Sequence, residues 1–231
     1  MRRFSLHAMA AASLAVAATV ALPQAVGAQT ANPAFCSART NLTPSAAPDD
    51  AKSAIASMAQ NAGGVASQPA TALASLYEKK GQKVFRSEKA FGYLSAIDQY
   101  VFESCPGTAV DATATDYQFA GIPATLPAGV TKIKFTNSAP KEEHEIAIFR
   151  LLPAAEGKDP LELLTLPEKK AAKYADLDSG VFTFAPAGSV GYTVADLEPG
   201  TYVYACFIPV DGKSKNAPHF MEGMYGTFTV A

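Results

Sequence analysis

The chain has 231 residues, of which 48% are hydrophobic and 17% are charged, as in globular proteins and unlike disordered ones. Its 19 lysines and arginines and 21 aspartates and glutamates give a formal net charge of −2, which argues against bulk binding of nucleic acid. With 16 glycines and 16 prolines, collagen-like and linker-like sequences are excluded as well.

Residues 1–28 have the pattern of a secretory signal peptide. Arg2 and Arg3 precede an alanine-rich apolar run over residues 8–22, and small residues at 26–28 offer a cleavage site. The run is too short and too interrupted to span a bilayer. We therefore expect a periplasmic or secreted protein without stable membrane insertion.

Residues 29–110 are predicted to form a small helical domain. A first helix begins at Pro48-Asp49-Asp50, where the acids complement the helix dipole, and Gly63-Gly64 ends it. A second helix is expected from Pro69 to about Gly81 and a third from about Ser87 to Glu103.

The chain has three cysteines, and export would place them where disulfides form. Cys36 precedes the helical set and Cys105 ends it, so we predict that these two are paired. A closed loop of roughly 70 residues would contribute roughly 4 kcal/mol, which a helical unit with a small core requires. Because the number is odd, Cys206 is expected to stay unpaired within the monomer.

Residues 111–231 show the two-residue period of β-strands. Val130–Thr136 alternates in polarity, and His144, Ile146 and Ile148 share one face of the next strand. Further strands are expected around Tyr117–Phe119, Phe182–Phe184, Tyr192–Val194, Thr201–Phe207 and Tyr225–Val230. Short strands between proline and glycine turns favour a β-sandwich, so the fold class is α+β with two domains. Asp159–Tyr174 has a helical pattern broken at Pro167 and is interpreted as an excursion from the sandwich.

The residues that could carry chemistry lie in this β half. Without residues 1–28, His144 and His219 are the only histidines, and Cys206 and Met224 accompany them. A thiolate, two imidazoles and a weak thioether form the ligand set of blue-copper sites, because soft sulfur stabilises Cu(I) and imidazole suits both oxidation states. Each residue alone has a structural interpretation, as a strand histidine, a buried cysteine or core methionine. Their coincidence favours one copper ion, with zinc as the weaker choice.

The stretch from about Tyr117 to Ala231 resembles the cupredoxins, the plastocyanin and azurin family of blue-copper proteins. An asparagine-containing loop, Asn137 to His144, precedes the first histidine, and Tyr202-Val203-Tyr204-Ala205-Cys206 matches the Y-x-Y/F-x-C strand of the family. His219 comes five residues before Met224, which precedes the last strand. The resemblance implies a Greek-key β-sandwich in which His144, Cys206 and His219 are equatorial copper ligands and Met224 is the axial one.

Two segments depart from the cupredoxin pattern, and the resemblance also suggests roles for Asn137 and Met221. The loop from Phe207 to Pro218 is longer than in plastocyanin and azurin, and Asp159–Tyr174 is extra. In the family, an asparagine at the position of Asn137 ties the ligand loops together by hydrogen bonds. The sequence is equally consistent with an asparagine that simply ends a strand. Met221 is interpreted as a packing or rim residue, because Met224 has the family spacing.

The leading hypothesis from the sequence is therefore an exported single-copper electron-transfer protein that is not an enzyme. His219, expected to be the most exposed ligand, would pass the electron to a redox partner protein that the sequence does not identify. One alternative is a copper carrier or sequestering protein of the cell envelope. Another is a metal-free interaction module. Two histidines cannot supply the extra centres of a multicopper oxidase.

Overall fold

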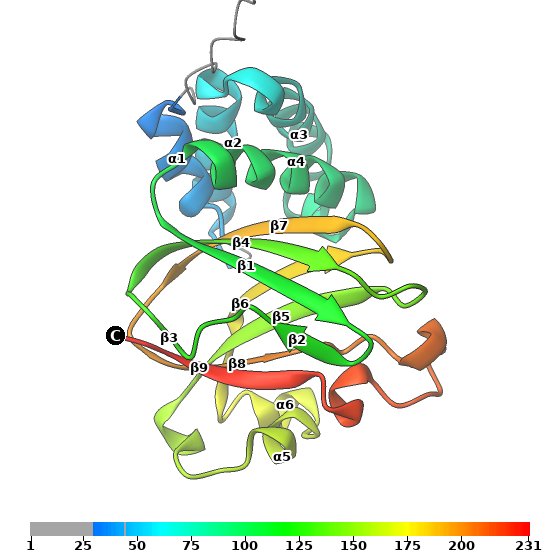
Figure 1. Cartoon of the computed structure of the whole chain (residues 1–231). Coiled ribbons are helices and arrows are strands. Elements are labelled where there is room, and N and C mark those ends of the chain that lie inside the picture. Colours follow the sequence, from blue (N-terminus) through cyan, green and yellow to red (C-terminus); the bar gives the residue numbers. More distant parts are fainter. Residues whose placement is uncertain (1–29, 44) are drawn as a thin grey trace, which may run out of the picture.

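The computed structural model describes residues 30–43 and 45–231, in which helices come first and two β-sheets follow (Figure 1). The predicted signal peptide, residues 1–28, lies outside the described residues. In the part of the chain that is described, no helix combines the length and the apolar character that crossing a membrane requires.

The first part of the structure contains four α-helices. They are α1 (Pro33–Thr40), α2 (Pro48–Asn61), α3 (Ser67–Lys80) and α4 (Glu88–Ser104). The short helices η1 (Gly64–Ala66) and η2 (Gly81–Arg86) connect them. The sequence analysis did not assign α1 separately, although Asn32 accepts a hydrogen bond from the amide of Ala34 and Pro33 opens the helix.

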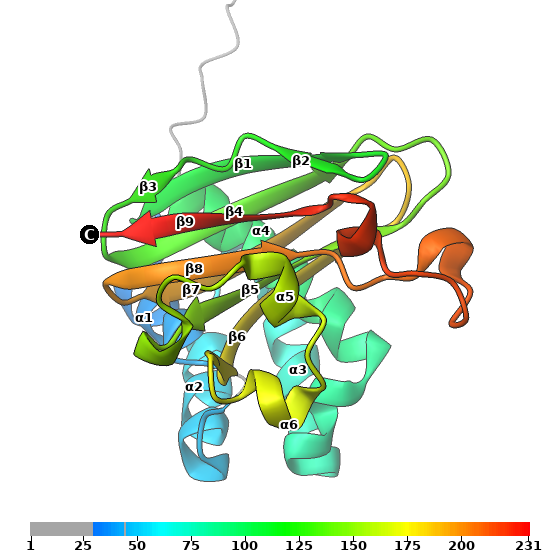
Figure 2. The same cartoon turned by 90° about the horizontal axis from the view of Figure 1, so that it is seen from below.

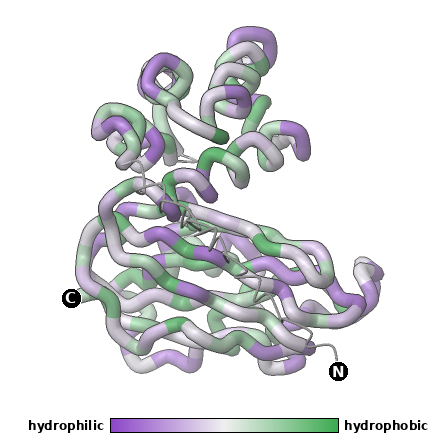
Figure 3. The backbone as a smooth tube through the Cα atoms, turned by 45° about the horizontal axis from the view of Figure 1, so that its top comes forward, coloured by the Kyte–Doolittle hydropathy of each residue, from purple (hydrophilic) through white to green (hydrophobic). Residues whose placement is uncertain are grey.

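The helices enclose their own hydrophobic core, with hydrophobic and hydrophilic stretches alternating along them (Figure 3). Phe35, Leu73 and Ile97 are fully buried within it. Arg39 and Asp98 form a buried ion pair there, with Nη2 of the arginine 2.8 Å from Oδ2 of the aspartate. Burial raises the pKa of Asp98, and the Arg39 guanidinium opposes that rise. The pair therefore joins α1 to α4 inside the core.

The predicted disulfide between Cys36 and Cys105 is confirmed. Cys36 lies within α1, and Cys105 directly follows α4. The bridge spans a sequence separation of 69 residues and so encloses α2, α3 and α4.

The described residues contain nine strands in two sheets that face each other (Figures 1 and 2). The first sheet has the order β2-β1-β4-β7 and the second the order β3-β9-β8-β5-β6. The strands of the first sheet are β1 (Thr108–Thr115), β2 (Gln118–Ala120), β4 (Gly129–Asn137) and β7 (Val190–Leu197). Those of the second are β3 (Thr125–Leu126), β5 (His144–Leu151), β6 (Ala175–Ala185), β8 (Gly200–Ala205) and β9 (Tyr225–Val230). The expected α+β class with a helical unit and a β-sandwich is confirmed.

Strand β1 pairs in parallel with β4, whereas the sequence analysis assigned no strand to its residues. The domain boundary expected between residues 110 and 111 consequently falls inside β1. Val110, Ala112 and Ala114 alternate as its buried positions. Alanine has low β-propensity, so the pairing is decided by β4 and not by the local sequence.

A second hydrophobic core fills the space between the sheets, with Phe135, Ile146 and Phe228 among its buried members. The helices cover the outer face of the first sheet, where α4 lies against β7 (Figure 1). Lys132 of β4 crosses this boundary, and its Nζ donates hydrogen bonds to the carbonyls of Phe102 (3.0 Å) and Cys105 (2.5 Å). A positive charge at the C-terminal end of α4 is favoured by the helix dipole.

The excursion after β5 covers the outer face of the second sheet (Figure 2). It contains α5 (Pro160–Leu164) and α6 (Glu168–Ala171), and the short helix η3 (Pro153–Ala155) lies between β5 and α5. Pro167 separates α5 from α6, as the sequence pattern predicts.

We expect the double variant Cys36→Ala/Cys105→Ala to lower the free energy of unfolding of the helical part by roughly 4 kcal/mol, because the open loop regains chain entropy. Urea unfolding followed by circular dichroism at 222 nm measures this change. The matched control is the wild type under reducing conditions, which should unfold at the same urea concentration as the variant. An unchanged midpoint would contradict the prediction.

Candidate metal centre

His144, Cys206, His219 and Met224 come together at one end of the second sheet. His144 is the first residue of β5, and Cys206 directly follows the neighbouring strand β8. His219 opens the short helix η5 (His219–Glu222), and Met224 immediately precedes β9. Because β5, β8 and β9 are adjacent strands, residues far apart in the sequence meet at the same edge.

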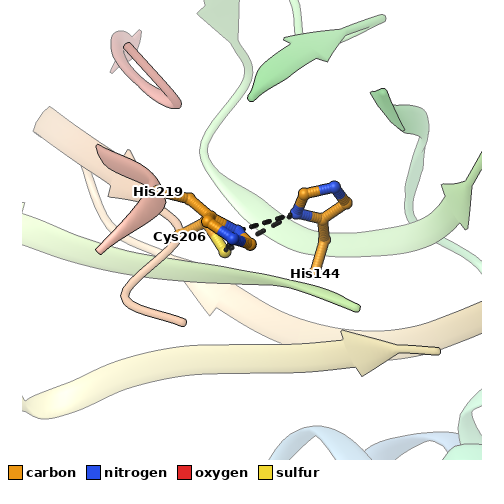
Figure 4. A group of neighbouring side chains, drawn as sticks. All are labelled: His144, Cys206 and His219. Atoms are coloured by element: carbon orange, nitrogen blue, oxygen red, sulfur yellow. Dashed lines mark hydrogen bonds between the residues drawn. The ribbon is translucent and has the colours of Figure 1, made fainter. Parts of the chain in front are cut away.

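Three potential ligand atoms converge within this cluster (Figure 4). The Nδ1 atoms of His144 and His219 are 3.1 Å apart. Sγ of Cys206 is 3.3 Å from Nδ1 of His219 and 3.9 Å from Nδ1 of His144. All three residues are fully buried, with relative exposures of 0%. The structure thus brings together the three equatorial ligands that the resemblance implies.

The spacing of these atoms fits a metal ion. A triangle with sides of 3.1, 3.3 and 3.9 Å has a circumscribed radius of about 2.0 Å, so one point lies at that distance from both nitrogens and the sulfur. Zinc sites set the scale for such bonds, with about 2.0–2.1 Å to imidazole and about 2.3 Å to thiolate. Both Nδ1 atoms face the thiol, whereas the Nε2 atoms have no hydrogen-bond partner among the described residues.

Met224 and not Met221 belongs to this buried cluster. The Met224 side chain is fully buried, whereas Met221 is 49% exposed. The Met224 carbonyl accepts a hydrogen bond from the amide of Cys206 (3.1 Å), and its own amide donates to the carbonyl of His219 (3.1 Å). The main chain of Met224 is therefore hydrogen-bonded to two of the three other site residues, so Met224 lies beside the cluster.

Asn137 links the loop before His144 to the sandwich. Its Nδ2 donates to the carbonyls of Glu142 and Ala185, both at 2.9 Å, and its Oδ1 accepts from the amide of Ala139, also at 2.9 Å. Ala185 is the strand partner of His144. Of the two interpretations left open by the sequence, the geometry fits the one in which Asn137 ties the loops together.

The long loop between Cys206 and His219 is itself a hydrogen-bonded structure. Pro209 and Pro218 form an isolated β-bridge, and the amide of Val210 donates to the carbonyl of Ala217 at 3.0 Å. The amide of His219 donates to the carbonyl of Ile208 at 2.9 Å. The extra length therefore folds back on itself and brings His219 close to the end of β8.

The expectation that His219 is the most exposed ligand is wrong, because its side chain is fully buried. The ring of Tyr117 packs edge to face against it, with centroids 4.9 Å apart. Oε2 of Glu142 lies 3.7 Å from Nε2 of His219, which is too far for a hydrogen bond, and the two groups would form an ion pair only with a protonated imidazole. Two residues that the sequence analysis did not select thus close the site.

Tyr117 occupies the tip of the β1–β2 hairpin with a φ of 58°, which is uncommon for a residue other than glycine. Such a conformation costs roughly 1–3 kcal/mol and persists where the surroundings enforce it. From the sequence, Tyr117 is only an aromatic residue at the start of a predicted strand, with no sign of a role beside His219. Its contact with His219 depends on the parallel pairing of β1 and could not be read from local patterns.

Burial sets the protonation of the metal-free site. It raises the pKa of the Cys206 thiol to about 12. Hydrogen bonds from the backbone amides of Glu145 and Ile208 lower this pKa, but by less than burial raises it. Burial also lowers the pKa of His144 to about 4, with His219 contributing, and lowers the pKa of His219 despite the nearby Glu142. At neutral pH the site consequently holds a protonated thiol and two neutral imidazoles. A metal ion entering it must displace the thiol proton.

Comparisons with known proteins identify similar folds but no relative by sequence. No family model and no curated protein matches the chain. An auracyanin from the photosynthetic bacterium Roseiflexus castenholzii is 21% identical, with 54% of this chain and 98% of that chain covered and a TM-score of 0.37. Auracyanin A, a "blue" copper protein from Chloroflexus aurantiacus, is 17% identical over 54% of this chain and 98% of that one, with a TM-score of 0.35.

An azurin from Methylomonas sp. strain J is 16% identical over 55% of this chain and 99% of its own, with a TM-score of 0.36. These likenesses concern the fold alone. The two facing sheets and the His144, Cys206 and His219 cluster beside Met224 agree with the resemblance found in the sequence. The C-terminal half of the chain is therefore a β-sandwich with a candidate metal centre at one end, as the resemblance implies.

Proposed function

We propose that the protein is an exported blue-copper protein that transfers single electrons through one ion held by His144, Cys206, His219 and Met224. The observation that carries this proposal is the convergence of two imidazole Nδ1 atoms and one thiol within 3.9 Å of one another in a fully buried space. When bound, copper supplies a one-electron Cu(II)/Cu(I) couple.

The side chains would hold both oxidation states in one geometry. Cys206 supplies a soft sulfur, which stabilises Cu(I), while the imidazoles suit Cu(I) and Cu(II) alike. The three ligand side chains are anchored at the ends of paired strands and are closed off from water, so they move little when the charge changes. No substrate needs to enter such a site, and the proposed protein is accordingly not an enzyme.

Because His219 is buried, we assign the route of the electron to Phe207. This residue is bonded directly to Cys206, and its side chain is 36% exposed. Its amide donates a hydrogen bond to Oε1 of Glu145 (3.1 Å), and the amide of Glu145 donates to Sγ of Cys206 (3.5 Å). The path from the thiolate to the surface thus follows the main chain from Cys206 to the next residue, Phe207. The two hydrogen bonds of Glu145 link the same two residues a second time.

A redox partner of this site is expected to carry a basic surface. Burial is the largest cause of the raised pKa of the Tyr117 hydroxyl. Negative charge nearby raises this pKa further, and it comes from Glu142, Asp211, Asp116 and Glu222. They surround the same end of the sandwich that holds the candidate ligands. Opposite charges steer association and increase its rate, more than they increase affinity.

Export of the protein is supported by the disulfide between Cys36 and Cys105, since such bonds persist in oxidising compartments. We therefore assign it to the periplasm or the extracellular space. The burial of both imidazoles also favours a second function, that of a copper carrier or sequestering protein in the cell envelope. The electron self-exchange rate of the copper-loaded protein separates the two functions, because a carrier needs no rapid turnover.

We expect one equivalent of Cu(II) to give an intense thiolate-to-copper absorption band and a narrow copper hyperfine splitting, both of which Cys206→Ser abolishes. The thiolate is the only soft anionic ligand in the cluster, so serine cannot replace it. Visible absorption and EPR spectra during copper titration measure both effects. A Cys206→Ser variant with full colour would refute the ligand assignment. If the wild type binds no copper, the remaining hypothesis is that the protein is a metal-free interaction module.

Met224→Leu should retain copper and raise the reduction potential, because a weak thioether ligand is removed from a site whose three strong ligands remain. We expect its copper affinity to fall by no more than about tenfold, equivalent to about 1.4 kcal/mol. Voltammetry and competitive titration measure the two quantities. Met221→Leu is the matched control and should change neither; complete loss of copper from Met224→Leu would show that this residue is a strong ligand.

The affinity for Cu(I) should increase about tenfold per pH unit between about pH 7 and 9. In this window the metal-free thiol, with its pKa of about 12, is protonated, His144, with its pKa of about 4, is neutral, and His219, whose pKa is lowered by burial, is neutral as well. Binding then releases one proton, and a rise in pH favours release. Competition with a Cu(I) chelator of known proton affinity measures the slope. Cys206→Ser should show a slope near zero; a flat wild-type profile would mean that the thiolate is already formed without metal.

A further inference from the structure

A cavity of about 420 Å³ lies between the outer face of the second sheet and the excursion that carries α5 and α6. Its volume is within the range of about 300–1,000 Å³ that is typical of small-molecule sites. It is separate from the candidate metal centre, because none of His144, Cys206, His219 and Met224 lines it. It meets the proposed electron route only at Phe207, which lines the cavity.

The wall of the cavity is almost entirely apolar. Eleven of its fourteen lining residues are aliphatic or phenylalanine side chains. The sheet contributes Phe149 and Phe182, whose rings meet edge to face at 5.4 Å, and Phe207 lies 6.2 Å from Phe149. Phe182 is 49% exposed and Phe207 is 36% exposed, so large aromatic surface remains open to water beside the cavity. A molecule with an apolar body would cover this surface and gain the free energy of its burial.

The charged residues of the wall are both acidic. Glu145 of β5 and Glu168 at the start of α6 line the cavity, and no lysine or arginine of the described residues does. Lys158 packs over the ring of Tyr174 at 5.2 Å but is not part of the lining. Aromatic faces attract cations, and carboxylates do so more strongly. The charge of the wall is thus complementary to a cationic ligand and opposes an anionic one.

We propose that this cavity binds an organic cation with an apolar body, such as an alkyl or aryl ammonium ion. The apolar part lies among the leucines of α5 and the phenylalanines of the sheet, and the positive group faces Glu145 and Glu168. The inference does not require a bound metal, since it rests on the apolar wall and the carboxylates of the cavity, although Glu145 and Phe207 belong both to this wall and to the surroundings of Cys206.

Isothermal titration of the metal-free protein with decyltrimethylammonium, below its micelle concentration, tests the proposal. Decyl sulfate and decanol carry the same chain with a negative and a neutral head. We expect one saturable site for the cation, with an affinity about tenfold or more above that for either analogue. Equal or tighter binding of decyl sulfate would overturn the proposal, as would the absence of a saturable site for the cation.

Two variants locate the site. Ala171→Phe places a phenyl ring in the cavity from α6 and should abolish cation binding. Glu168→Gln removes an exposed carboxylate and should weaken cation binding about two- to fivefold without affecting decanol. Glu162→Gln on α5 removes a similar exposed charge outside the cavity and is the matched control. Undiminished binding by a folded Ala171→Phe, or an equal loss in Glu162→Gln and Glu168→Gln, would place the cation elsewhere.

Glu145 is left unchanged in this experiment because it contacts the metal centre through Cys206 and Phe207. Amide chemical shifts, recorded with the cation and with the apolar analogue, give an independent readout. The proposal predicts that the largest shifts fall in residues 163–177 and at Phe182 and Phe207. Shifts confined to the helical residues 33–104 would overturn it.

Discussion

The exclusion of water from one end of the sandwich is the constraint on which the candidate site depends. Two imidazoles and a thiol are fully buried there, and their Nδ1 and Sγ atoms face one another. Within the part of the chain that the structure describes, neither Nε2 atom has a hydrogen-bond partner. Burial keeps both histidines neutral and the thiol protonated in the metal-free site. A metal ion held by Sγ and the two Nδ1 atoms would displace the thiol proton and accept one lone pair from each of these three atoms.

Keeping this space closed requires contributions from several distant segments. Asn137 fixes the loop before His144, and the long loop after Cys206 folds back through its own hydrogen bonds. Tyr117 adopts a left-handed backbone conformation at a hairpin tip and packs on His219. Backbone strain concentrated at a functional site indicates that the surrounding structure holds the residue in place. The result is a site whose histidines are both covered, which directs attention to Phe207 as its link to the surface.

The helical part provides a base for the opposite sheet and is joined to it by polar as well as apolar contacts. The disulfide and the Arg39–Asp98 pair tie α1 to the end of α4, and Lys132 of β4 donates to the carbonyls at that same end. The second sheet is covered in turn by the excursion that contains α5 and α6. The sandwich therefore has added structure on both outer faces, and the cavity with its phenylalanine and glutamate wall is a product of the second addition.

The amino-acid sequence by itself determined which residue types can bind a metal and in what order they occur, because only His144, Cys206, His219 and Met224 combine soft and imidazole ligands at the appropriate spacings. It also determined the period of most helices and strands and the pairing of Cys36 with Cys105. It did not reveal strand β1, since Val110, Ala112 and Ala114 carry a weak local signal and the strand is fixed by pairing with β4. Only the tertiary structure decided the burial of His219, the contact with Tyr117 and the cavity beneath α6, because each depends on segments that meet across long stretches of chain.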